Sequence, residues 1–326
     1  MNVKAIMQYL GKCRREISEL ANVRGEKSVS YWFDYLWCAV RHGCLIRQYV
    51  YGEFYRLSSI DRKESMTYPR LIKVFKKLNH PDYVHLLENK RDFNVHFAPY
   101  VKREWIYIPE TDFNTFCEFA DRHNYVIVKP LDLCEGQGVY GLQLLKDNDK
   151  RKAVYEELSG KNIMVEQCIK QHKDMNMGGR SVNTIRMHTI LDKDGNVHCF
   201  KPVFRAGVGD AVVDNYCAGG CCYEVDLELG VLITPSLSKD HIQHKIHPGT
   251  NKIVYGYQIP PNWDKVIVDI TNAAKMLPQC RFIGWDIAIT DNGIELIEGN
   301  HNPDYELIEF FGTRGWYAKT REWISY

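Results

Sequence analysis

The stretch VIVKPLDLCEGQGVYGLQLL, residues 126–145, places glycines at the spacing G-x-G-x-x-G between two runs of alternating and β-branched character. Such runs predict strands, so the glycines are expected to join one strand to the next. A Rossmann domain would join a strand to a helix here, and a Walker loop would need G-K-S/T. A protein kinase has its lysine after the glycine loop, whereas Lys129 precedes this one. The sequence therefore argues against these three nucleotide-binding folds.

What remains is a strand that ends in Lys129 and Pro130, then a glycine hairpin, then a returning strand. The backbone N–H groups of such a hairpin can cover phosphates, while a lysine at the strand end meets their charge. An ordinary glycine turn is the alternative, because hairpins with this spacing are common. A metal site elsewhere in the chain would favour the phosphate lid.

A second hairpin, FIGWDIAITDNGIELIEGN at residues 282–300, supplies a candidate metal site. If residues 291–293 form the turn, Asp286 lies directly opposite Glu298, and Asn300 shares their face. Two carboxylates with Cβ atoms about 5 Å apart repel each other by roughly 3 kcal/mol when both are ionised. Two carboxylates and an amide suit Mg²⁺, which bridges substrate phosphates. A two-residue turn at positions 292–293 would instead put the acids on opposite faces, and solvated hairpin acids are a further alternative.

The composition is that of a globular protein without a strong electrostatic attraction to nucleic acid. The 326 residues include 45% hydrophobic and 25% charged residues, and the formal net charge is +1. Eleven cysteines are scattered through the chain and form no C-x-x-C pair. Because the N-terminal segment is amphipathic and not a signal sequence, we expect reduced thiols in a cytoplasmic protein.

An aromatic stretch, YWFDYLWCAVRHGCLIRQYVYGEFY at residues 31–55, is the most hydrophobic part of the N-terminal region. Asp34, Arg41, His42 and Arg47 interrupt it well short of the roughly 20 apolar residues that a membrane span needs. We predict a helix that is buried or faces the substrate. Peripheral contact with a membrane is the alternative.

The order of the expected elements predicts an α+β fold. Residues 1–100 have mostly helical patterns, and short strands alternate with helices from about residue 104. Thr111 is expected to be the N-cap of a helix over residues 111–124. Gly178 and Gly179 mark an internal boundary near residues 175–180, with no linker long enough for independent domains.

Several blocks of the sequence together resemble the ATP-grasp superfamily of carboxylate–amine ligases. The resemblance is closest to the sugar-transfer-associated ATP-grasp family of bacterial polysaccharide gene clusters. The blocks are SVNTIR (181–186), FRAGVGDAVVDNYCAGG (204–220), HPGTNKIVYGYQIP (247–260) and IGWDIAITDNGIELIEGN (283–300). The resemblance implies an ATP-grasp fold in which two α+β lobes clamp ATP. A small lobe with the glycine lid would span residues 101–178 and a large lobe with the metal site residues 179–326, after a helical region of residues 1–100.

The resemblance also assigns roles to individual residues. ATP would be bound by Lys90, Lys129, Glu135, Gly136, Gln137, Gly138, Glu166, Gln167, Cys168, Ile169, Asp174 and Arg186. Lys129, Arg186 and Arg205 would be catalytic, and Asp286, Glu298 and Asn300 would hold Mg²⁺. Glu166 is expected near the adenine amino group, with the backbone of residues 167–169 as an interlobe hinge and Asp174 at the ribose. Glu166 can also be read as a salt bridge to a neighbouring strand, and Arg186 and Arg205 as ordinary strand-face charges.

The function implied by the resemblance is an ATP- and Mg²⁺-dependent carboxylate–amine ligase that works through an acyl phosphate. The acid is expected to be a sugar acid, or another small-molecule carboxylate, used in bacterial surface polysaccharide biosynthesis. The partners would be this acid and an amine, with no nucleic acid and no transmembrane segment. The alternatives are an ATP-grasp kinase for small molecules and a non-catalytic nucleotide-binding scaffold.

Overall fold

The computed structural model describes residues 3–131, 138–177, 181–208, 220–236, 245–247, 256–257, 263–309 and 314–324. The predicted lid residues Glu135, Gly136 and Gln137 lie outside these ranges. Gly138, the last of that group, is exposed and has a φ of 69°.

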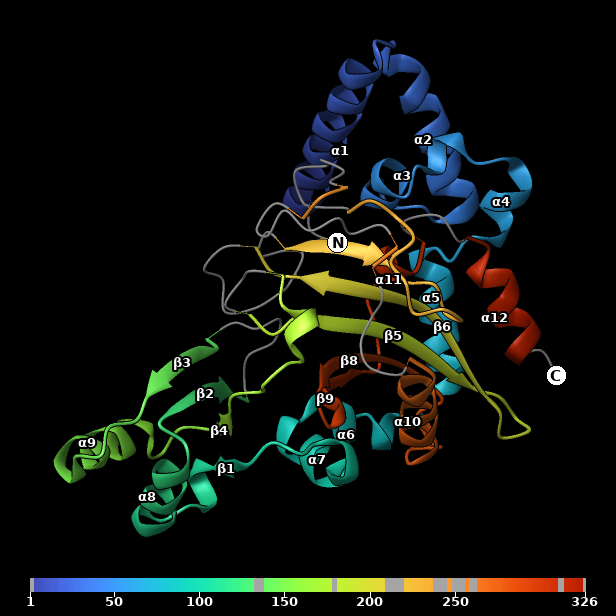
Figure 1. The fold of residues 1–326 in the computed structure, drawn as a ribbon. Helices are drawn as coiled ribbons and strands as arrows, with labels where there is room; N and C mark the ends of the chain where they lie inside the picture. Colours follow the sequence, from blue (N-terminus) through green and yellow to red (C-terminus); the bar gives the residue numbers. More distant parts are fainter. Residues whose placement is uncertain are drawn as a thin grey trace.

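The first hundred residues are mostly helical, as predicted. The helices are α1 (Val3–Arg24), α2 (Ser28–His42), α3 (Ile46–Tyr51), α4 (Ser59–Glu64), α5 (Tyr68–Leu78), α6 (His85–Glu88) and α7 (Lys90–His96), with 3-10 turns η1 (Phe54–Arg56), η2 (Pro81–Tyr83) and η3 (Ala98–Tyr100). Helices α1 and α2 form a hairpin that stands above the rest of the molecule in Figure 1. Their shared core contains Cys13, Ile17, Tyr35 and Cys38. Helix α2 ends at Gly43, whose φ of 69° closes the last turn.

A small antiparallel sheet with the strand order β1-β4-β2-β3 follows. Its elements are β1 (Trp105–Tyr107), η4 (Ile108–Glu110), α8 (Phe113–Arg122), β2 (Tyr125–Pro130), β3 (Tyr140–Gln143), α9 (Asn148–Leu158) and β4 (Ile163–Gln167). Helices α8 and α9 pack on the sheet through Phe116, Phe119 and Leu158, which are buried against Val126 and Val128. Strands β2 and β3 pair directly, so the glycine stretch does join strand to strand.

The N-cap of helix α8 is Asp112, and the prediction of Thr111 was wrong. The Asp112 carboxylate accepts a hydrogen bond from the N–H of Thr115 at 2.8 Å. The Thr111 hydroxyl donates instead to the carbonyl of Tyr107 at 2.7 Å. Both residue types can cap a helix, and here the 3-10 turn at residues 108–110 positions the aspartate to do so.

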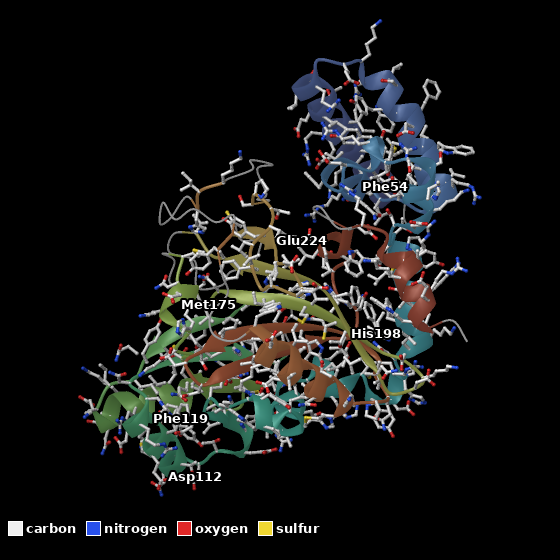
Figure 2. The ribbon with its side chains drawn as sticks, turned by 45° about the vertical axis from the view of Figure 1, so that its right-hand side comes forward. Phe54, Asp112, Phe119, Met175, His198 and Glu224 are labelled. Carbon is white, nitrogen blue, oxygen red and sulfur yellow. The ribbon has the colours of Figure 1, made fainter. Side chains whose placement is uncertain are left out.

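A larger antiparallel sheet with the strand order β7-β6-β5-β8-β9 forms the centre of the molecule. Its elements are η5 (Lys173–Met175), β5 (Thr184–Leu191), β6 (Val197–Ala206), β7 (Cys221–Glu224), α10 (Trp263–Lys275), β8 (Phe282–Thr290), β9 (Gly293–Asn300), α11 (Tyr305–Glu309) and α12 (Trp316–Ile324). One face packs on α6, α7 and α10 and contains the largest core cluster. The other face looks toward α5, α11, α12 and the N-terminal helices (Figure 1). In Figure 2, Glu224 lies between this sheet and the helices around Phe54, while Phe119 marks the opposite end of the molecule.

The β8–β9 hairpin pairs Asp286 with Glu298, as predicted, although the turn differs from the prediction. Thr290 pairs with Gly293, so the turn has two residues instead of three. Such a register alone would shift Glu298 to the wrong face. A bulge between the pairs Ile287–Leu296 and Asp286–Glu298 adds one residue to β9 and restores the alignment.

Two expectations drawn from composition can be compared with the structure. All nine cysteines of the described ranges are free. Among the helices of these ranges, none combines the length and the hydrophobicity needed to cross a membrane.

Gly284 in β8 is required by the close approach of the chain that follows β9. A Cβ atom on Gly284 would lie 2.5 Å from the Cβ of Pro303, well inside van der Waals contact. We therefore expect Gly284→Ala to lower the free energy of unfolding by about 1–3 kcal/mol, measured by chemical denaturation. Gly11→Ala is the control, because Gly11 lies in α1 with no atom within 4 Å of an added Cβ. That variant should gain about 0.5–1 kcal/mol, and equal stabilities for the two variants would contradict the close packing.

Candidate active site

The carboxylate of Asp286 is the centre of a charged group on the second face of the large sheet. Arg186 on the adjacent strand β5 binds it through Nε and, at 3.0 Å, through Nη2. Arg205 on β6 reaches the same carboxylate at 3.1 Å and is oriented by a 3.0 Å hydrogen bond from its Nε to Thr184 Oγ1. Burial alone would raise the pKa of Asp286, but the two guanidinium groups outweigh it and hold this pKa well below its usual range. Three predicted site residues are thus in direct contact.

Glu298 and Asn300 complete the predicted metal ligands on β9. Asn300 Nδ2 donates to Glu298 Oε1 at 3.2 Å. Burial, and next the charge of Asp286, raise the pKa of Glu298. The two paired carboxyls therefore favour either a proton or a cation between them. Oxygen donors of this kind fit Mg²⁺.

A metal site here would need the amide oxygen of Asn300 as well as the two acids. Within the described ranges, three or more His, Cys, Asp or Glu residues nowhere come together as a possible metal site. The assignment of a metal to Asp286, Glu298 and Asn300 therefore stays a prediction. It is based on the pairing of the acids and on the chemistry of the three donors.

Lys129 ends strand β2 and lies near both sheets. Its Nζ is 2.5 Å from Glu166 Oε2, and the charge of Glu298 on the large sheet also acts on it. Burial lowers the pKa of Lys129, and the attraction of Glu166 opposes that shift. Lys90, the first residue of α7, donates to the carbonyl of Pro130 at 3.4 Å. The structure therefore brings the two predicted phosphate lysines to the same strand end.

Arg103 links the two sheets and was missed by the analysis of the sequence. Its guanidinium binds Glu166 of β4 at 2.8 Å and Glu295 of β9 at 2.7 Å. It also donates to the carbonyl of Leu296 at 2.7 Å and to Asn94 Oδ1 of α7 at 3.1 Å. The three ionic side chains are no more than 4% exposed. Glu166 thus holds Arg103 and Lys129 at once, so the small sheet, the large sheet and Lys129 share one buried network.

The relationship of the chain to known proteins follows from a family model. The model described as sugar-transfer associated ATP-grasp matches residues 70–322, which is most of the chain. The chain belongs to this family. No protein with a curated description was found to match the sequence.

Solved structures of several ATP-grasp proteins are also similar. The ATP-grasp ligase PsnB, complexed with a variant of its minimal precursor, Mg and ADP, matches with a TM-score of 0.45 and 14% identity, over 74% of this chain and 60% of PsnB. D-alanyl-alanine synthetase A from Vibrio cholerae matches with a TM-score of 0.41 and 13% identity, over 73% of this chain and 65% of that protein. D-cycloserine synthetase DcsG matches with a TM-score of 0.43 and 11% identity, over 74% of this chain and 72% of that protein. This chain thus spans less than two thirds of PsnB.

In this ATP-grasp protein, Glu166 forms the salt bridges that were considered as the alternative to adenine binding. Its Oε2 faces Lys129 and Arg103, and its Oε1 accepts from Asn94 Nδ2 at 3.2 Å. The N–H of Gln167 donates to the carbonyl of Glu104 at 2.8 Å. That hinge N–H is therefore used within the protein, and contact of Glu166 with adenine stays a prediction.

The other predicted ATP contacts of this ATP-grasp protein lie around the end of β4. Cys168 and Ile169 are half-buried just beyond the strand, and the charge of Lys129 acts on the Cys168 thiol. Asp174 lies in the turn η5, and its carboxylate is half-exposed and 3.8 Å from His172 Nδ1. The Tyr257 hydroxyl donates to the backbone carbonyl of Asp174. The carboxylate of Asp174 is thus accessible, as a ribose-binding acid must be, and that role is a prediction.

Proposed function

We propose that this chain is an ATP- and Mg²⁺-dependent carboxylate–amine ligase. The observation that carries the proposal is the convergence of Arg186, Arg205, Asp286 and Glu298 on one sheet face, within electrostatic reach of Lys129. Two acids that favour a cation beside three basic groups suit a nucleotide triphosphate bound with a divalent metal. In this proposal, residues 101–178 form the lobe with the glycine lid and residues 179–326 the lobe with the metal site.

The chemistry needs positioning and charge neutralisation more than a dedicated base. The terminal phosphorus of ATP would leave the oxygen of ADP and bond to a carboxylate oxygen of the substrate, giving ADP and an acyl phosphate. The amine nitrogen would then attack the acyl carbon, release phosphate and lose a proton. Asp286, Glu298 and Asn300 would hold Mg²⁺, which supplies positive charge to the phosphate oxygens.

When nucleotide binds, Arg186 and Arg205 would have a possible partner besides Asp286. In the structure Arg186 and Arg205 neutralise Asp286. An incoming phosphate oxygen would compete for the same guanidinium groups and release the carboxylate for its metal. Lys129 would meet the phosphates from the side of the small sheet. Arg205 would stabilise the negative charge that develops at the acyl centre.

The family description supports a substrate connected with sugars. We propose that the acid is a sugar acid or a related small-molecule carboxylate, used in the cytoplasm for bacterial surface polysaccharide biosynthesis. The chemistry of the site does not depend on which acid is bound.

The test is ADP release with Mg·ATP and a panel of sugar acids, each with and without amines. The ligase requires ADP release that depends on the acid, and hydroxylamine should trap the acyl phosphate as a hydroxamate. ADP release with a hydroxyl-bearing acceptor and no hydroxamate would show a small-molecule kinase instead. Binding of Mg·ATP without turnover on any acceptor would indicate a scaffold.

A further inference from the structure

The outward side of helix α2 carries a row of exposed apolar residues. Phe33, Trp37 and Val40 are 73%, 62% and 88% exposed, and Val29 and Leu36 are exposed as well. These five residues form the outer face of α2. Large apolar side chains rarely form a continuous patch on the solvent-exposed surface of a protein unless that patch is a binding site.

The outer face is continuous because its residues recur at helical spacing. Positions 29, 33, 36, 37 and 40 are three or four apart, so they share one side of the helix. Tyr31, Tyr35, Cys38 and His42 occupy the opposite side and are buried against the N-terminal core. The sequence predicted one buried or substrate-facing helix from this segment. The structure buries only one side, so burial is confirmed for that side and not for the outer face.

The charge around this helix indicates what the outer face binds. Residues 1–78 contain fifteen Lys and Arg against seven Asp and Glu, a net charge of +8. The whole chain has a net charge of +1, so residues 79–326 carry −7. On the α1–α2 hairpin, Arg14, Arg15, Lys27 and Arg41 are exposed. The apolar face therefore belongs to a strongly basic end of an otherwise acidic protein.

Two partners can be compared on this charge. A second copy of the chain would bring two regions of +8 together if it paired through the same face, and this repulsion opposes the association. An anionic lipid surface attracts the basic residues and accepts the apolar ones. Helices with Trp, Phe and aliphatic residues on one side and Lys or Arg nearby lie in the headgroup region of membranes.

We propose that the outer face of α2 docks this protein on an anionic lipid surface. The helix would lie parallel to the surface, with Phe33, Trp37 and Val40 between the headgroups and the basic residues of the hairpin beside the lipid phosphates. In Figure 1 the α1–α2 hairpin stands above the large sheet, at the end of the molecule away from the small sheet. The proposal does not depend on which reaction the site performs.

The test is sedimentation of the full chain with vesicles made of equal parts phosphatidylcholine and phosphatidylglycerol. Wild type should bind these vesicles, and should bind less in high salt or with phosphatidylcholine alone. Phe33→Gln/Trp37→Gln/Val40→Gln should lower the partition coefficient by more than about tenfold, because three apolar side chains no longer enter the lipid. Val95→Gln/Leu229→Gln/Val268→Gln is the matched control, since these residues are exposed and lie elsewhere.

A folding defect is not expected to account for weaker vesicle binding, because the three substituted residues are exposed and glutamine is a good helix former. The thermal midpoint of the outer-face variant should match that of wild type. Failure of wild type to bind the anionic vesicles would overturn the proposal, as would undiminished binding by the outer-face variant. A wild-type dimer that becomes a monomer in the outer-face variant, with no vesicle binding, would show that the face binds a second copy instead.

Discussion

Glu298→Gln is expected to lower acid-dependent ADP release by at least about 10²-fold, while the ligand-free fold is retained. Glutamine keeps the shape of the side chain and can still accept the hydrogen bond from Asn300. It cannot supply the negative charge that a divalent cation needs from this position. The variant should therefore lose the dependence of nucleotide affinity on Mg²⁺, measured by titration with and without the metal.

Asp291→Asn is the matched control for this prediction. Asp291 lies in the turn of the same hairpin, its side chain is 82% exposed, and it lies outside the paired residues of β8 and β9. Both variants remove one carboxylate from the hairpin and keep the shape of the side chain. ADP release by Glu298→Gln at the level of Asp291→Asn would show that the paired acids are not the metal site.

The pairing of Asp286 with Glu298 could be predicted from the sequence, although the turn and the bulge of the hairpin both differ from the prediction and offset each other. The alternation of two strands around a short turn limits the possible registers. The predicted three-residue turn is a two-residue turn in the structure, and a bulge in β9 adds the missing residue. Bulges leave no clear pattern in apolar and polar residues, so a sequence cannot distinguish these two arrangements.

Arg103 and the outer face of α2 could not be predicted, for a shared reason. Lys102, Arg103 and Glu104 resemble an exposed charged segment, and only Arg103 is buried. Its partners Glu166 and Glu295 are 63 and 192 residues away in the sequence. Which charge or which helix side becomes buried depends on elements distant in the chain, and local periodicity carries no such information.

Arg103→Met is expected to lower the free energy of unfolding by about 3–5 kcal/mol, the largest stability change predicted for this protein. Methionine fills a similar volume but leaves the carboxylates of Glu166 and Glu295 buried without their guanidinium. The matched control is Arg122→Met. Arg122 binds Glu104 at the same 2.8 Å distance, but both partners are about half exposed. Removing such a surface pair costs about 0–1 kcal/mol.

A further variant tests why Arg103→Met lowers the free energy of unfolding. Arg103→Met/Glu295→Gln removes the charge of Glu295, while Glu166 keeps Lys129 as its partner, so this variant should recover part of the lost stability in chemical denaturation. A loss with Arg103→Met no larger than that with Arg122→Met would contradict the buried network. A double variant less stable than Arg103→Met would show that packing, and not the unpaired charge of Glu295, dominates.

Arg103 should also affect the proposed binding of phosphate by Lys129, an effect that a purely structural role of Arg103 would not have. The charge of Arg103 lowers the pKa of Lys129, while that of Glu166 raises it. Without Arg103, Glu166 has Lys129 as its remaining cationic partner and should hold it more firmly. Lys129 would then be less free to leave Glu166 for an incoming phosphate, so we expect the KM for ATP to rise more than kcat falls.

Arg103→Lys keeps the positive charge and should restore much of the KM, because the lysine introduced at position 103 still competes with Lys129 for Glu166. An unchanged KM in folded Arg103→Met protein would mean that the network joins the two sheets without positioning Lys129.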